Sequence, residues 1–317
     1  MLSRVADSLY WSSRYLERAE HTARLLDTNL NLMLDQSAAA NQARLGRLLT
    51  ALHSRMPATA AEDVYQLTNT LTFDLTNHNS IMACIISARE NARQVREQIS
   101  SEMWEQLNQL FLNLKSTTLD KIWNAQPWEF FRSIKEGSQL FQGITNSTMN
   151  HGEGWLFIEV GRFMERAVEL SALLDTHIAT FGNDEIGSED YLEWLGLLKS
   201  CTGFESYCKV YTADLRPRWI AEFLLLNAEF PHSLRFSIDM VHNALSAIDK
   251  ATETHKSGRV TRLAGRLKAS LSFGQIDEIV AGGMHEYLAD IQRQCGELHT
   301  AIYETYVAYP IDAALSV

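Results

Sequence analysis

The sequence has 317 residues, of which 46% are hydrophobic and 21% charged, and its formal net charge is −11. This length allows a large core in one big domain or two moderate ones. The acidic balance argues against a general nucleic-acid-binding protein, which would carry a basic face or arm.

Helix is expected along almost the whole chain, because proline occurs only five times and apolar residues recur with a period of about 3.6. The first helix is predicted from Ser3, acting as its N-cap, to about Leu34. Predicted helices follow at about 39–54, 60–73, 80–100, 102–115 and 128–143. Asn79 or Ser80 is expected to cap the helix at 80–100. No stretch shows the alternation of a strand.

The turn-rich segment GITNSTMNHGEG, at 143–154, is predicted to connect two halves of the chain. The second half is predicted to begin with a helix at about 154–181 and an exit loop at 182–188. Further helices are expected at about 189–211, in a short segment opened by Pro217, and at 233–256, 259–272 and 275–309. Gly282 and Gly283 are expected to kink the last one.

A stretch of the first helix, RYLERAEHTARLLDT, occurs again in altered form as RFMERAVELSALLDT at 162–176. Eight of the fifteen aligned positions are identical: Arg14/Arg162, Glu17/Glu165, Arg18/Arg166, Ala19/Ala167, Leu25/Leu173, Leu26/Leu174, Asp27/Asp175 and Thr28/Thr176. Self-similarity of this kind indicates an internal duplication.

The repeated stretch places charges on one face of each helix, at positions i, i+3, i+4 and i+7. In the first copy these are Arg14, Glu17, Arg18 and His21, with Arg24 extending the face; in the second they are Arg162, Glu165, Arg166 and Glu169. The first interpretation is that arginine and glutamate form ion pairs that fix how two related halves dock. The second is that paired arginines form a bidentate site for phosphate or carboxylate, held in place by glutamate.

The segment SARENARQVREQIS places a second set of arginines along one side of a helix: Arg89, Arg93 and Arg96. Two interpretations remain open for this set. It forms a solvated face, or it joins the charged layer of the repeated helices.

Motifs for metal or nucleotide chemistry are missing from the sequence. The single Glu-x-x-His, from Glu229 to His232, contains Pro231 and therefore predicts a turn rather than a ligand-bearing helix. No glycine-rich nucleotide loop occurs, and we expect neither a metal nor a cofactor. Among the histidines, His21 and His232 stand out, because each lies beside an Arg/Glu-rich or proline-turn element.

The sequence predicts a cytoplasmic protein with no membrane-spanning segment. It contains no run of 18 apolar residues, and its N-terminus lacks the apolar core of a signal peptide. The four cysteines match no metal or redox spacing, which is typical of reduced, buried thiols.

The chain resembles the bacterial alpha-E domain family over essentially its whole length. The resemblance is carried by MLSRVADSLYWSSRYLERAEHTARLLD, SARENARQVREQISSEMWEQLN and GWLFIEVGRFMERA, and by the stretches SCTGFESYCKVYTADLRPRWIAEFLLLNAEFPHSLRFSID and AGRLKASLSFGQIDEIVAGGMHEYL. The family is all-α and is associated with circularly permuted ATP-grasp ligases and with transglutaminase-like proteins. The resemblance therefore implies a role in ATP-dependent peptide or amide formation, as the component that does not bind ATP.

The family's charged pattern falls on three helices of this chain. It matches Arg14, Glu17, Arg18, Glu20 and Arg24, then Arg89, Glu90, Arg93 and Arg96, and finally Arg162, Glu165 and Arg166. The sequence departs from the family's usual form at Val168 and Ala172, and His232 stands where the turn commonly carries Pro-Arg-Ser. If the arginines bind an anion, these departures reduce the contribution that the second half makes to the binding site.

We therefore predict an all-α, multi-helix bundle that forms a single unit over 1–317, with related halves at about 1–150 and 151–317. The leading function is an accessory or scaffold component that partners a circularly permuted ATP-grasp ligase, and also a transglutaminase-like protein. Its Arg/Glu layer is expected either to dock the halves or to bind an anionic ligand, such as an acidic peptide or a phosphate-bearing molecule. Catalysis by the chain alone is not expected. The alternatives are an enzyme acting on an amide or acyl phosphate in an Arg/Glu cleft, and a purely structural helical oligomer.

The candidate binding residues are Arg14, Glu17, Arg18, His21, Arg24, Arg89, Arg93, Arg162, Glu165 and Arg166. The scaffold hypothesis expects Arg14, Glu17, Arg162 and Glu165 to be fully paired and closed off from solvent. The binding and enzyme hypotheses expect an open cleft with at least one arginine fork directed at solvent.

Overall fold

The computed structural model describes residues 1–34, 37–54, 63–182, 190–252 and 258–308. Over these ranges the chain forms fifteen α-helices and no strand, which confirms the all-α prediction. None of the described helices is long and apolar enough to span a membrane.

The helices up to residue 148 begin with α1, at Ser3–Met33. The others are α2 (Ala38–Ala51), α3 (Val64–Thr72), α4 (Ile81–Gln94), α5 (Ser101–Lys115), α6 (Leu119–Asn124) and α7 (Pro127–Thr148). Ser80 caps α4 by accepting a hydrogen bond from the Ala83 amide at 3.2 Å, as expected. Ser3 is not a cap, because it is already helical and Leu2 occupies the cap position without a side-chain hydrogen bond.

The remaining helices begin with α8, at Glu153–Phe181. They continue with α9 (Tyr191–Ser200), α10 (Phe204–Tyr211), α11 (Pro217–Leu226), α12 (Leu234–Thr252), α13 (Gly258–Phe273), α14 (Ile276–Gly282) and α15 (Met284–Ile302). The break between α14 and α15 falls at Gly283, whose φ of +99° favours glycine. The predicted exit loop beyond Gly182 and the ends of several predicted segments, at 60–62, 253–256 and 309, lie outside the described residues.

Three boundary predictions were wrong, and one helix was missed. The connection predicted at 143–154 is mostly helical, because α7 continues to Thr148, whose hydroxyl donates to Ser100 Oγ at 2.8 Å. The helix predicted at 189–211 breaks at Thr202, where φ is +52°. A Cβ at the following Gly203 would lie 3.0 Å from Phe230 Cζ, so glycine permits this close approach. The helix predicted at 80–100 ends at Gln94 and gives way to a 3₁₀ turn, and α6 was not predicted.

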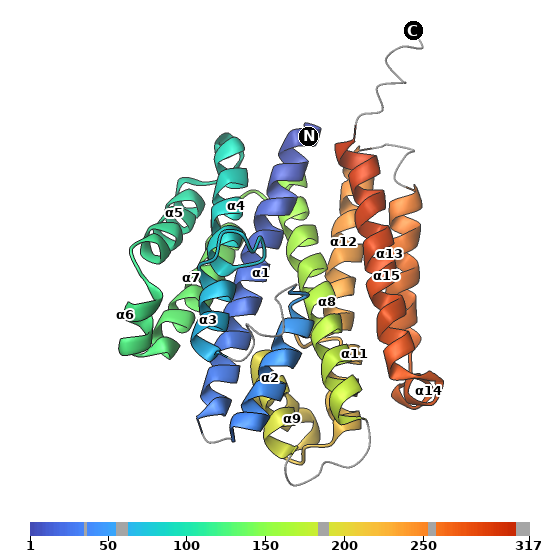
Figure 1. Ribbon diagram of the computed structural model, residues 1–317. Coiled ribbons are helices and arrows are strands. Elements are labelled where there is room, and N and C mark those ends of the chain that lie inside the picture. Colours follow the sequence, from blue (N-terminus) through green and yellow to red (C-terminus); the bar gives the residue numbers. More distant parts are fainter. Residues whose placement is uncertain (35–36, 55–62, 183–189, 253–257, 309–317) are drawn as a thin grey trace.

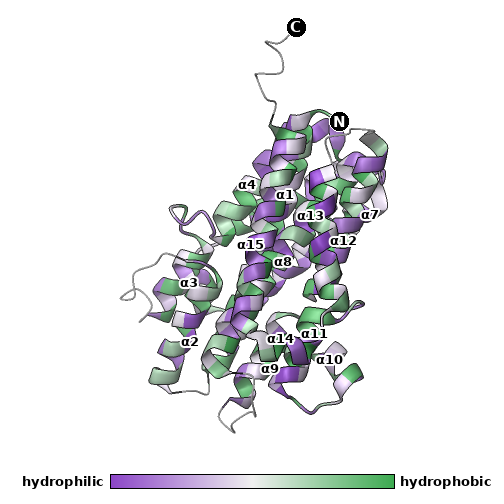
Figure 2. Cartoon of the chain, turned by 90° about the vertical axis from the view of Figure 1, so that its right-hand side faces the viewer, coloured by the Kyte–Doolittle hydropathy of each residue, from purple (hydrophilic) through white to green (hydrophobic). Residues whose placement is uncertain are grey.

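Two long helices, α1 and α8, run side by side through the middle of the molecule (Figure 1). On one side of this pair, α4 and α7 pack against α1, and α5 packs against both of them. On the other side, α12 and α15 pack against α8, and α13 packs against both of them. Outer helices such as α13 and α15 carry hydrophilic and hydrophobic residues along their lengths, as amphipathic helices do (Figure 2).

Because α1 and α8 have neighbours on several sides, both are buried over much of their circumference. Leu9, Leu16 and Leu26 of α1 are buried, and so are most of the charged residues on its other face: Arg14, Glu17, Glu20 and Arg24. The charged face predicted from the sequence therefore lies inside the protein rather than on its surface.

Gly161 sets how closely the two central helices approach. A Cβ at this position of α8 would collide with Ser13 Oγ and with the backbone carbonyl oxygen of Tyr10 in α1. We expect Gly161→Ala to lower the free energy of unfolding by about 2–3 kcal/mol, because overpacking forces the helices apart. Denaturant unfolding measures this loss.

Gly296 supplies the matched control for that substitution. It is exposed in the middle of α15, and a Cβ there would meet no atom within 4 Å. Gly296→Ala should raise stability by about 0.5–1 kcal/mol, because alanine favours helix. Equal effects at the two positions would contradict the assigned role of Gly161.

Candidate functional site

The repeated charges meet where α1 crosses α8, and Glu165 of α8 lies at the centre. Arg14 Nε donates to Glu165 Oε2 at 2.6 Å, and Arg18 Nε donates to Oε1 at 2.5 Å. Burial alone would raise the pKa of Glu165, but the charges and hydrogen bonds of the two arginines outweigh it and lower the pKa to about 2. This carboxylate is therefore ionised and accepts from two arginines of the opposite helix.

Glu17 of α1 has the reciprocal arrangement. Arg166 of α8 binds it with a bidentate fork, from Nε at 2.6 Å and Nη2 at 3.0 Å, and Arg162 Nε lies 3.8 Å away. Burial raises the pKa of Glu17, but Arg166 and then Arg162 lower it below its usual value. Each glutamate of the repeat thus faces the two arginines of the opposite helix, and both carboxylates are 0% exposed.

Glu169 and Glu20 are buried beside these ionised carboxylates. Burial and the neighbouring Glu165 raise the pKa of Glu169 to about 8. Burial and the neighbouring Glu17 raise the pKa of Glu20. Two carboxylates that share a dry site resist ionising together, so Glu169 is largely protonated at neutral pH.

Arg24 links two histidines that are far apart in the sequence. Its Nη1 lies 2.9 Å from Nδ1 of His232, in the turn before α12, and its Nη2 lies 3.3 Å from Nδ1 of His21. A guanidinium only donates, so the ring nitrogens facing it accept. Burial and the nearby arginines lower the pKa of both rings, that of His21 to about 3, so both are neutral.

Arg14 also connects the central helices to α15. Its Nη1 donates to Tyr10 Oη at 3.1 Å and lies 3.2 Å from Nδ1 of His299. Arg18 reaches in the other direction, toward the loop before α4, where its Nη1 donates to Asn79 Oδ1 at 2.8 Å. The cluster therefore ties the central pair to both flanking groups of helices.

We call this set of buried and half-buried side chains the Arg/Glu layer; it comprises Arg14, Glu17, Arg18, Glu20, His21, Arg24, Glu159, Arg162, Glu165, Arg166, Glu169 and His232. The structure brings eight of the ten predicted site residues into it. The predicted site residues did not include Glu20, Glu159, Glu169 or His232 of the layer, nor Tyr10 and His299 beside it, although Glu169 occupies the position equivalent to His21 in the repeat.

Arg89 and Arg93 lie outside the Arg/Glu layer. Arg89 donates to Asn108 Oδ1 at 2.9 Å and rests on the rings of Trp104 and Phe111. Arg93 is exposed and pairs with Glu90 on its own helix. Arg93 therefore fits the solvated-face interpretation, whereas Arg89 packs between α4 and α5. Neither arginine joins the charged layer.

The layer is mostly closed and internally paired. Two arginines at its edge retain some exposure: the side chain of Arg18 is 18% exposed and that of Arg162 is 24% exposed. Arg162 differs from the expectation of full pairing, because its nearest carboxylate oxygens, on Glu17 and Glu159, lie 3.8 and 3.9 Å away. The geometry matches ion pairs that dock two helices better than an open cleft.

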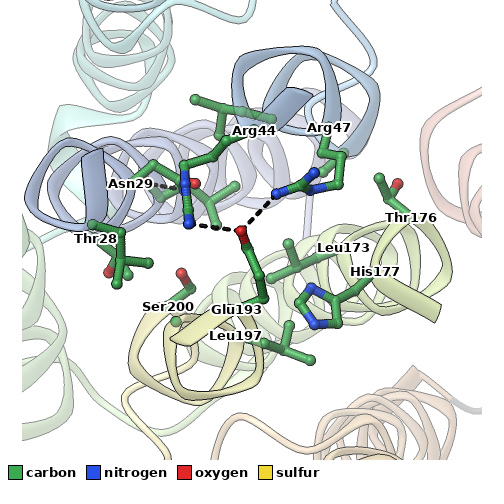
Figure 3. Close-up of a pocket in the computed structure, with 15 residues that line it drawn as sticks. Thr28, Asn29, Arg44, Arg47, Leu173, Thr176, His177, Glu193, Leu197 and Ser200 are labelled. Carbon is green, nitrogen blue, oxygen red and sulfur yellow. Dashed lines mark hydrogen bonds and ion pairs between the residues drawn. The ribbon is translucent and has the colours of Figure 1, made fainter. Parts of the chain in front are cut away.

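A cavity of about 50 Å³ lies next to the layer, between α1, α2, α8 and α9 (Figure 3). Arg44 Nη2 and Arg47 Nη2 of α2 lie 2.7 and 3.0 Å from Glu193 Oε1 of α9. The repeat also reaches this cavity, since Leu25 and Thr28 line it together with their equivalents Leu173 and Thr176. The LLDT sequence shared by both copies of the repeat could have indicated the α1 and α8 walls of this cavity. Nothing in the sequence indicated that α2 and α9 form its other walls.

Within the described ranges no group of three or more histidine, cysteine, aspartate or glutamate side chains is arranged to hold a metal ion. All four cysteines are free thiols, and burial raises the pKa of Cys84, Cys201 and Cys295 to about 12.

Comparison with known proteins identifies one family and distant relatives. The family model Alpha-E, described as a predicted alpha-helical domain with a conserved ER motif, matches residues 1–307. Uncharacterized proteins of Mycobacterium bovis and Mycobacterium tuberculosis are 23% identical to the chain over 336 residues. The match covers 97% of this chain but 37% of each relative, so the chain spans little more than a third of their length. No solved structure matches the chain.

Proposed function

The chain belongs to the Alpha-E family, and on that premise we propose that it is the non-ATP-binding component of an ATP-dependent peptide- or amide-ligation system. Its partners would be a circularly permuted ATP-grasp ligase and a transglutaminase-like protein, the associations that the family resemblance implies. The length of the relatives supports a modular role, because the matching region makes up only 37% of each of those polypeptides.

The observation that carries the scaffold part of this proposal is the position of the ER motif. The dipeptide Glu-Arg occurs in this chain only at 17–18 and 165–166. Glu165 accepts from Arg14 and Arg18 of the opposite helix, and Glu17 accepts a bidentate pair of hydrogen bonds from Arg166. We infer that the motif locks α1 to α8. Buried ion pairs barely repay their desolvation, so they specify an arrangement more than they stabilise it.

The ion pairs between the ER motifs of α1 and α8 support a duplicated architecture within a single unit. The packing of α4, α5 and α7 around α1 corresponds to the packing of α12, α13 and α15 around α8. Together with the repeated sequence, this correspondence favours two related halves that meet at the Arg/Glu layer. A rigid double bundle of this kind offers a large outer surface for a ligase partner.

The alternative of an enzyme acting in an Arg/Glu cleft has one observation in its favour. A pKa near 8, as at Glu169, is a property of carboxyl groups that act as general bases. However, Glu169 is buried against Glu165, and a substrate would reach it only if α1 and α8 separated. The scaffold role requires no such opening.

The proposal is tested by measuring ATP turnover of an ATP-grasp ligase encoded alongside the chain. We expect ATP turnover by the ligase, measured with its acceptor substrate present, to rise severalfold when the chain is added. We also expect the two proteins to co-elute in gel filtration. Arg93→Ala, an exposed change outside the layer, should leave both results unchanged. Absence of a complex together with unchanged turnover would contradict the partnership.

A further inference from the structure

The cavity between α1, α2, α8 and α9 carries a surplus of positive charge. Among the described residues, the charged and titratable groups that line it are Arg44, Arg47, Glu193 and His177. Both arginines lie within 3.0 Å of the same oxygen of Glu193, so two cations share one carboxylate. This local surplus occurs in a chain whose formal net charge is −11.

His177 adds a buried polar group without a partner. Its Nε2 has no hydrogen-bond partner among the residues that the structure describes, and the side chain is buried. Its ring lies 4.8 Å from that of Phe181 and 4.5 Å from that of Trp194, which fix its orientation beside the cavity (Figure 3). Burial, then Arg47 and Arg44, lower its pKa to about 3, so the ring is neutral and has one N–H to donate.

Arg47 is the accessible arginine of the pair. Its side chain is 18% exposed, against 3% for Arg44. Its guanidinium lies 4.8 Å from the centroid of the Phe181 ring, which supports its plane. Within the part of the chain that the structure describes, Nη2 makes its ion pair with Glu193, and the fork has further donors for a second acceptor.

The size and walls of the cavity restrict the ligand. At roughly 10–15 Å³ for each water-sized sphere, a volume of about 50 Å³ accommodates about three to five non-hydrogen atoms. Leucines 25, 173 and 197 provide apolar wall, while Thr28, Thr176 and Ser200 carry hydroxyls. Such a site suits a short carbon stem that ends in a planar anion.

We propose that this cavity binds the carboxylate end of a peptide, either an aspartate or glutamate side chain or the C-terminal carboxylate. Arg47 would donate a hydrogen bond to one carboxylate oxygen and His177 to the other, while the leucines contact the adjoining carbon. The inference rests on the proposed function in one respect: it names an acidic peptide as the ligand of the ligation component.

The test uses the full chain alone and three probes. These are acetyl-glycyl-glycine with a free C-terminus, its C-terminal amide, and N-acetyl-aspartate whose α-carboxyl is amidated and whose side-chain carboxylate is free. Binding is followed by NMR titration. We expect saturable shifts at Gly196, Thr28 and Thr176 with at least one carboxylate probe and none with the full amide. The two carboxylate probes distinguish a C-terminal from a side-chain ligand.

Two variants and a control connect this binding to the cavity. Arg47→Gln should weaken binding by about tenfold or more, since it removes a charge-assisted hydrogen bond to the carboxylate. His177→Phe should weaken it severalfold while keeping the aromatic packing. Arg93→Gln makes the same charge change at a distant exposed site and should leave binding unchanged.

Three outcomes would overturn the inference: no saturable binding by either carboxylate probe, equal binding by the amide, or unchanged binding by Arg47→Gln. Inorganic phosphate binding as tightly as the carboxylates would also overturn it, as a general anion site. Because the ligase is absent from this experiment, a failure here leaves the partnership intact, and a failure of the partnership leaves the cavity result intact.

Discussion

Glu165→Gln should lower the free energy of unfolding by about 3–5 kcal/mol, because it leaves two buried guanidiniums without their counter-charge. Arg14 and Arg18 both donate to this carboxylate, which is completely buried. A glutamine has one acceptor oxygen and a donor amide, so it cannot satisfy both arginines. Denaturant unfolding at pH 7 measures the loss.

Glu90→Gln is the matched control for that substitution. Glu90 also pairs with an arginine, Arg93, but both side chains are well exposed. Exposed pairs contribute about 0–1 kcal/mol, so this change should alter stability by about 0.5 kcal/mol at most. A loss below about 1 kcal/mol for Glu165→Gln would show that the buried pair does not hold the helices together.

The second large effect is a loss of stability between pH 5 and pH 8.5 that depends on Glu169. Burial and Glu165 raise its pKa from 4.5 to about 8 in the folded protein. A group whose pKa is raised by folding contributes its full stabilisation when the pH lies below its pKa in the unfolded chain. For Glu169 this contribution to the free energy of unfolding is lost as the pH rises through 8, its pKa in the folded protein. At about 1.36 kcal/mol per unit, the loss is on the order of 4 kcal/mol.

The groups around Glu169 fix the sign of this dependence. Arg18 Nε lies 3.9 Å from one carboxyl oxygen, and His21 Nε2, which is neutral, lies 3.7 Å from the other. The carboxylate of Glu165, whose pKa is lowered, opposes a second negative charge. Glu165 contributes the opposite dependence, because its own stabilisation is present above pH 4.5 and disappears only as the pH falls toward 2.

Glu169→Gln should abolish most of the decline in stability between pH 5 and pH 8.5. The amide resembles the protonated acid in size and remains uncharged at every pH. Urea unfolding of both proteins at several pH values measures the difference between the two curves. Parallel curves would mean that Glu169 ionises freely in the folded state, and would contradict the burial argument.

The sequence predicted the central helices and their charged faces well, because both are written in local patterns. The period of apolar residues set α1 at Ser3–Met33 and α8 at Glu153–Phe181 within one residue of the predicted ends. The repeated spacing of arginine and glutamate identified most of the Arg/Glu layer. Local patterns were less successful at helix ends, where tertiary contacts decide, as at Thr148.

Contacts between distant segments could not be predicted in the same way. His232 was noticed as a departure in a turn, but its approach to Arg24 depends on how α12 enters the bundle. The cavity requires α2 and α9 to bring Arg44, Arg47 and Glu193 together, and none of these belongs to a recognisable motif. The sequence also left burial open between a closed, paired layer and an open cleft, since a charged helix face ordinarily indicates solvent.

The central claim, that the two ER dipeptides lock α1 to α8, is tested most directly by a double-mutant cycle. The variants are Glu17→Gln, Arg166→Met and the two combined, with free energies of unfolding measured under one set of conditions. Each single change leaves one buried charge without its partner, whereas the double change removes both. We predict a coupling energy of about 2 kcal/mol or more, with the double variant at least as stable as either single variant. Additivity within about 0.3 kcal/mol would contradict the claim, because it would mean that these residues do not act on each other in the folded protein.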